Sequence, residues 1–319
     1  MQSRQMPMES SLCAWPGPSR QANVWMARKL RIQEVMSVHS NSARCSESHG
    51  QRGISLVELM VSMAIGLFII LAVTQIFINT GGHYRFRQGQ SENLITGRYT
   101  LEMLEAQMAK AGYRRDPSQD TAEAFPAAAG YANGCAFDVR EAIATADHGL
   151  CIRYQPYDAQ EVDFAGKYYN GGSMAPSALG AYTAADPSTV MFVERYYVDE
   201  ATQELRWVPK NVALASGTVL ADGVRSIHFE FGVGPASDSE AQRSIQEFTT
   251  APEANESIRA LRYTVLLESP TGRVSVGMES SACDQWTEAG GDEELCSDNS
   301  AGKLLQLASG AVMLRNLMP

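Results

Sequence analysis

Two absences mark the N-terminal third of the chain. No proline occurs between Ile54 and Gly112, and residues 54–78 carry a single charged residue, Glu58. Because proline breaks the interior of a helix, its absence leaves the whole stretch open to one long helix. About 20 apolar residues are enough to cross the hydrocarbon core of a bilayer as a helix. The sequence therefore predicts a membrane-spanning helical segment over residues 54–80.

Motifs of enzyme chemistry are also missing. The sequence has no HExxH, GxSxG, P-loop or glycine-rich nucleotide motif, and no CxxC pair that would suggest zinc. Outside residues 1–53 there are three histidines, His83, His148 and His228, spread along the chain. We therefore expect no enzyme activity, no cofactor and no metal site.

Positive charge is scarce. The chain has 26 Lys and Arg against 36 Asp and Glu, a formal net charge of −10. Without residues 1–53, which hold seven basic and three acidic residues, the remainder has 19 basic and 33 acidic ones. A nucleic-acid-binding surface needs concentrated Lys and Arg. We therefore expect no directly bound nucleic acid.

The lone acid in the apolar run requires a partner. A carboxylate at the centre of a membrane helix costs roughly 2.5–3.5 kcal/mol. A cut after Gly53 would make Ile54 a new N-terminus with a free amine, whose ordinary pKa is about 8. Glu58 would then lie one helical turn from that amine. The two charges would neutralise each other, within one chain or between neighbouring chains.

The glycine, the glutamate and the apolar run at these offsets resemble the class III signal of type IV prepilins and of type II secretion pseudopilins. The resemblance implies that a membrane peptidase cleaves between Gly53 and Ile54 and N-methylates Ile54. It also implies that Glu58 guides docking into a growing filament. Residues 1–53 would be a leader peptide, and a start at Met36 would give the leader a more usual length of 18 residues.

A second pattern follows the apolar run. Apolar residues recur at helical spacing over residues 81–112 and predict an amphipathic continuation of the helix. They are Leu94, Leu101, Leu104, Met108 and Ala111. Gly81 and Gly82 are expected to bend or loosen the helix, and Gly112 to end it.

The remainder, residues 113–319, is expected to be a β-rich globular domain. Predicted strands cover 150–154, 190–198, 204–208, then 219–220 followed by 224–231 as one alternating strand, 258–267 and 304–317. Residues 281–302 are expected to form a polar loop. The fold class is therefore α+β, with a long N-terminal helix packed on an antiparallel β-sheet. The resemblance to prepilins implies that this arrangement is the type IV pilin-like fold.

Four cysteines lie outside the leader, and they allow three pairings. The local pairing joins Cys135 to Cys151 and Cys283 to Cys296, closing loops of about 16 and 14 residues. Disulfides need an oxidising compartment, which here indicates the periplasm.

Two further segments resemble PilW-type minor pilins: residues 97–113, which open with Gly-Arg-Tyr and close with Ala-Gly-Tyr, and the ending Leu314-Arg315-Asn316. That resemblance implies a minor pilin that takes part in initiating type IV pilus assembly and supports adhesion, twitching motility or DNA uptake. Its partners would be the prepilin peptidase, other minor pilins, the major pilin and the inner-membrane assembly platform. It would span the inner membrane once, with a periplasmic C-terminal domain, before entering the pilus.

Two alternatives share parts of this pattern. A type II secretion minor pseudopilin of the GspJ kind has the same signal and fold, and neighbouring genes would distinguish it. A membrane-anchored periplasmic receptor or enzyme whose anchor resembles the signal would keep its activity in the soluble domain and tolerate changes at Gly53.

Overall fold

The structure, a computed structural model, describes residues 53–172, 186–187, 189–235, 244–253, 256–272, 281–297 and 302–318. The chain forms two compact units, Met1–Ile65 and Gly66–Pro319, which are described separately. All of the expected leader except Gly53 lies outside the described residues.

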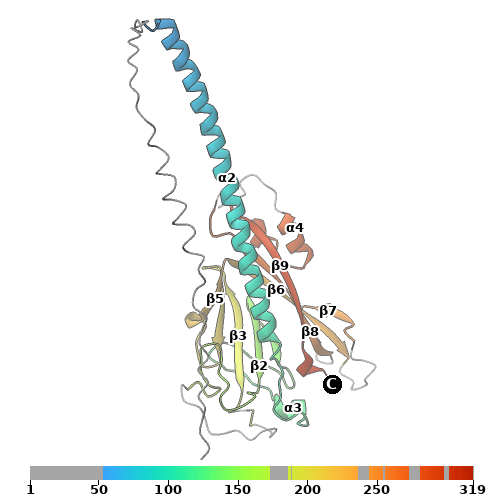
Figure 1. Cartoon of the computed structure of the whole chain (residues 1–319). Coiled ribbons are helices and arrows are strands. Elements are labelled where there is room, and N and C mark those ends of the chain that lie inside the picture. Colours follow the sequence, from blue (N-terminus) through green and yellow to red (C-terminus); the bar gives the residue numbers. More distant parts are fainter. Residues whose placement is uncertain are drawn as a thin grey trace, which may run out of the picture. The chain divides into compact units, whose positions relative to one another are not determined.

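The described elements follow one another in this order: α2 (Leu56–Met108), α3 (Thr121–Ala124), β1 (Ile143–Ala146), β2 (Gly149–Tyr154), β3 (Phe192–Asp199), β4 (Glu204–Pro209), η1 (Leu214–Ser216), β5 (Thr218–Asp222), β6 (Val224–Pro235), β7 (Glu247–Thr249), β8 (Glu256–Glu268), α4 (Ser281–Glu288), α5 (Glu294–Ser297), β9 (Leu305–Met313) and η3 (Arg315–Leu317). A long N-terminal helix followed by antiparallel strands confirms the α+β class (Figure 1).

The helix α2 runs without interruption through Gly81 and Gly82, in line with the missing proline. Its buried face differs from the predicted stripe, because the side chain of Leu94 is 48% exposed while Asn93 and Gly97 are buried. The full buried set in the helix is Gly89, Asn93, Gly97, Thr100, Met103, Leu104 and Met108. Small and polar residues therefore share this face with the large apolar ones that the pattern singled out.

Gly97 is buried because α2 approaches the second sheet closely at this residue. A Cβ added at Gly97 would lie 2.8 Å from Leu267 Cδ1 on β8 and 3.2 Å from Ala308 Cβ on β9. The side chain of Asn93 ties α2 to the residue that precedes β9, since its Nδ2 donates to the carbonyl of Leu304 at 3.0 Å. Backbone therefore packs directly on the sheet at this point, and glycine permits it.

The β-strands form two antiparallel sheets instead of the single one expected. One has the order β1-β2-β3-β4-β5 and the other β7-β6-β8-β9 (Figure 1). The segment predicted as one strand over 219–231 crosses from the first sheet to the second at Gly223. This residue has φ +73°, and an added Cβ would lie 2.8 Å from the carbonyl oxygen of Glu268. A left-handed glycine thus divides what the alternating pattern joined.

One core serves both sheets. Leu104 and Met108 of α2, Trp207 of β4, and Phe231 and Tyr263 of the second sheet belong to the same buried cluster. The phenol of Tyr263 also donates to the carbonyl of Leu101 at 3.3 Å.

The last segments differ from the prediction in detail. Residues 281–302, expected as a polar loop, hold the short helices α4 and α5. Trp286 of α4 is buried with Leu266 and Leu305 of the second sheet, and this contact holds the helix on the sheet. The final strand ends at Met313, and η3 follows it.

Candidate assembly segment

The predicted processing site lies at the start of the described chain, in the first compact unit. Gly53 and Ile54 precede α2, which begins at Leu56, and both are exposed. Apart from its own neighbours in the chain, no described residue has a heavy atom within 4 Å of a Cβ added at Gly53. The peptide bond between Gly53 and Ile54 is therefore in exposed, non-helical backbone, the kind of site at which proteolytic cleavage concentrates.

Glu58 lies in the first turn of α2 and is exposed. The helix dipole favours a negative charge at this end. Within the part of the chain that the structure describes, Glu58 makes no ion pair. In the uncut chain the nitrogen of Ile54 belongs to a neutral amide. A positive charge one turn away from Glu58 would exist only after cleavage.

Within the described part of the chain, no residue covers the apolar surface of α2 over its first six turns. The large apolar side chains from Ile54 to Ile78 are each between 50% and 78% exposed. Among the described residues, α2 is the one helix long and apolar enough to cross a membrane, with a mean hydropathy of 2.6 in its most apolar window. A helix that is apolar on all sides is stable only when lipid or other helices surround it.

Comparison with known proteins bears on the same segment. Residues 48–74 match the family model of the prokaryotic N-terminal methylation motif. The chain carries a prepilin-type methylation motif. This motif spans Gly53, Ile54 and Glu58 and fits a membrane-anchored protein.

No curated protein sequence matches the chain. Among solved structures, a type IV-like pilin from Thermus thermophilus is similar over 72% of this chain and 98% of that one. The two share 12% identity with a TM-score of 0.32.

The four cysteines behave as two different pairs. Cys135 and Cys151 are joined by a disulfide, with their Cα atoms 5.8 Å apart. This bond ties the loop before β1 to β2. Cys283 and Cys296 are free thiols, which differs from the second bridge expected from the sequence. They lie on the separate helices α4 and α5, where burial and a hydrogen bond with Cys283 raise the pKa of the Cys296 thiol.

The end of α2 and the C-terminal segment meet in the structure, although they are about 200 residues apart in sequence. The Nδ2 of Asn316 donates to the carbonyls of Ala109 and Ala111, at 2.9 and 3.2 Å. A Cβ added at Gly112, which has φ +73°, would lie 2.1 Å from Leu317 Cδ2. The end of the chain thus satisfies carbonyl groups left open where α2 ends.

A buried carboxylate in the first sheet was missed by the sequence reasoning. Glu194 on β3 accepts hydrogen bonds from the phenols of Tyr154 and Tyr196, at 3.0 and 2.6 Å. Burial raises its pKa, and these hydrogen bonds and the charge of Lys110 oppose the shift. Alternation along residues 190–198 predicted the strand, but it does not distinguish a buried acid from an exposed one.

Proposed function

We propose that this chain is a minor pilin that takes part in initiating type IV pilus assembly and so supports adhesion, twitching motility or DNA uptake. The observation that carries the proposal is the uncovered apolar part of α2, which has one charge, Glu58, inside a methylation motif. The rest of the chain supplies a folded domain with a disulfide.

The proposed sequence of events follows from this segment. Prepilin peptidase cleaves between Gly53 and Ile54 and methylates the new amine of Ile54. The helix holds the protein in the inner membrane as a single span, with the domain of residues 113–319 in the periplasm. In the filament, other pilins replace lipid around the apolar surface, and Glu58 neutralises a subunit's N-terminal amine. The energetic reason is that an unpaired carboxylate is costly in an apolar medium.

The proposed processing and assembly of the chain imply four kinds of partner. They are the prepilin peptidase, other minor pilins, the major pilin and the inner-membrane assembly platform. The chain acts as a structural subunit in this proposal, and the methylation motif and the PilW-like segments support that role. Its acidic composition argues against direct binding of DNA, so any contribution to DNA uptake in this proposal comes through assembly of the pilus.

Complementation of a deletion strain tests the proposal. Glu58→Ala should leave cleavage intact but reduce the number of surface pili, because the chain can no longer pair its charge during assembly. Ser62→Ala is the matched control: Ser62 lies one turn further along α2 and its hydroxyl bonds to the carbonyl of Leu59 within the helix. It should restore piliation. Normal pili in the Glu58 variant would contradict the docking role, and loss of protein secretion with intact pili would indicate a pseudopilin instead.

A further inference from the structure

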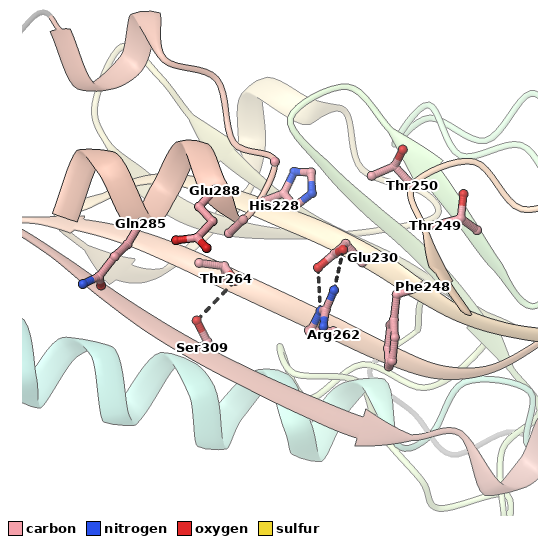
Figure 2. Close-up of a pocket in the computed structure, with 12 residues that line it drawn as sticks. His228, Glu230, Phe248, Thr249, Thr250, Arg262, Thr264, Gln285, Glu288 and Ser309 are labelled. Carbon is pink, nitrogen blue, oxygen red and sulfur yellow. Dashed lines mark hydrogen bonds and ion pairs between the residues drawn. The ribbon is translucent and has the colours of Figure 1, made fainter. Parts of the chain in front are cut away.

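The four-stranded sheet carries a groove on the face opposite to α2. Its floor is formed by side chains that alternate with the core residues: His228 and Glu230 of β6, Arg262 and Thr264 of β8, and Ser309 of β9. One wall is α4 with the turn that follows it, and the other is β7 (Figure 2). The groove has a volume of about 800 Å³. Binding sites for small molecules span about 300–1,000 Å³.

A fixed ion pair lies at the centre of the floor. The Nε and Nη2 of Arg262 each donate to one carboxylate oxygen of Glu230 at 2.6 Å (Figure 2). The guanidinium also lies over the ring of Phe248 on β7, 4.4 Å from its centroid. These three contacts hold the group in one orientation, and Nη1 has no hydrogen-bond partner among the described residues. The groove therefore presents an oriented donor and carboxylate acceptors side by side.

The wall beside His228 packs closely against the imidazole ring. Gly290 has φ +85°, and a Cβ added there would lie 3.0 Å from His228 Nε2. The ring of Trp286 stands edge-on to the imidazole at 6.4 Å, and its Nε1 donates to the carbonyl of Asp292 at 2.9 Å. Burial lowers the pKa of His228, so its imidazole is neutral at pH 7. It is able to donate from one nitrogen and accept at the other.

The chemistry of the lining selects a class of ligand. Glu230 and Glu288 outnumber the single guanidinium of Arg262, so nothing favours a polyanion. The other polar groups are neutral hydroxyls and an amide, from Thr249, Thr250, Thr264, Ser309 and Gln285. The ring of Phe248 is 37% exposed at the edge of the groove. Neutral polyols present both hydrogen-bond donors and acceptors together with an apolar C–H surface, and this lining matches all three.

The geometry points to a binding site for a neutral saccharide in this groove, built on Arg262, Glu230 and Phe248. The site lies outside the assembly segment and does not depend on whether the chain enters a filament.

The test uses the full chain in detergent micelles and a printed array of neutral, sulfated and sialylated oligosaccharides. We expect binding to neutral members, and the affinity for the best of them to fall about tenfold in Arg262→Gln, since the oriented donors are lost. Gln285→Ala, on the exposed face of α4, should weaken the same binding without affecting the fold. Arg140→Gln is the matched control, because Arg140 is exposed and lies outside the groove.

Three outcomes would overturn the site. They are an array with no neutral glycan bound, a preference for sulfated or sialylated glycans, or equal affinity in Arg262→Gln and Arg140→Gln. The melting temperature of each variant shows whether a loss of binding is caused by unfolding. If Arg262→Gln unfolds, Gln285→Ala, a change on a solvent-exposed helix face, tests the site in its place: equal affinity in Gln285→Ala and Arg140→Gln would then overturn it.

Discussion

Glu58 and Ile54 show how one residue's chemistry depends on processing. Before cleavage the glutamate has no described cationic partner, and the nitrogen of Ile54 carries no charge. In the proposed processing step, cleavage would change this amide into an amine, and the new N-terminus would become a partner for a carboxylate in an apolar medium. In the proposal, cleavage after Gly53 creates the amine that Glu58 pairs with when the chain enters a filament.

A substitution at Gly53 tests whether the peptidase recognises this residue, independently of any effect on folding. Gly53→Val should slow processing, because a peptidase that accepts glycine at this position has to admit a branched side chain. Gly66→Val is the control at a second glycine where an added Cβ meets nothing within 4 Å. Immunoblots of uncut and cut chain should show accumulated precursor for Gly53→Val alone. Equal processing of both variants would argue against recognition at Gly53.

Glu194 gives a pH-dependent contribution to stability. Its folded pKa is raised by burial, so the folded state holds the proton at pH values where the unfolded state has released it. The free energy of unfolding therefore falls as pH rises above about 4.5, the ordinary glutamate value, by at most about 1.4 kcal/mol per pH unit, until the folded pKa is passed.

Glu194→Gln should remove this contribution, because the amide stays neutral and keeps hydrogen bonds with Tyr154 and Tyr196. The melting temperature of the variant relative to that of the unchanged chain should rise between pH 4.5 and pH 8. Glu123→Gln, at an exposed position of α3, should follow the unchanged chain. Parallel pH profiles for the Glu194 variant and the unchanged chain would show that Glu194 does not titrate differently on folding.

At the scale of elements, the packing of α2 on the second sheet depends on a missing side chain. Gly97→Val should destabilise the domain by about 1–3 kcal/mol, the usual cost of overpacking, because its Cβ would meet Leu267 and Ala308. Gly81→Val places the same side chain in the same helix with no atom within 4 Å, and should be nearly neutral. Thermal unfolding of the two variants compares them directly. Equal melting temperatures would show that the helix does not pack on the sheet at Gly97.

The disulfide between Cys135 and Cys151 ties the loop ahead of β1 to β2. Breaking it, as in the double variant Cys135→Ala and Cys151→Ala, should cost roughly 3 kcal/mol, the value for a loop of about 15 residues. Peptide mapping without reductant should recover the two cysteines in one linked peptide. A peptide that links Cys151 to Cys283 would contradict this connectivity.

For the whole molecule, the sequence predicted the elements better than their assembly. The apolar run and the missing proline indicated α2, and alternation indicated most strands, because both signals are local. The sheet to which a strand belongs depends on residues distant in the sequence. Only Gly223 separates β5 from β6, yet β5 pairs with β4 in one sheet and β6 pairs with β8 in the other. The helices α4 and α5 have eight and four residues, too few for a clear helical period.

The candidate sites also differ in how far apart their residues lie in the sequence. Gly53, Ile54 and Glu58 were predicted because their offsets lie within six residues of one another. The groove was not, because Glu230 and Arg262 come from strands that are paired only by the fold. The contact of Asn316 with the end of α2 likewise depends on bringing the C-terminus back to the helix.

Mass spectrometry of the chain purified from its native membranes, with sequencing of its N-terminal peptide, shows whether the proposed processing occurs. We predict a chain that begins at Ile54 and carries a methyl group on its α-amine. A protein that retains residues before Ile54, with no shortened form in any fraction of the cell, would contradict this prediction.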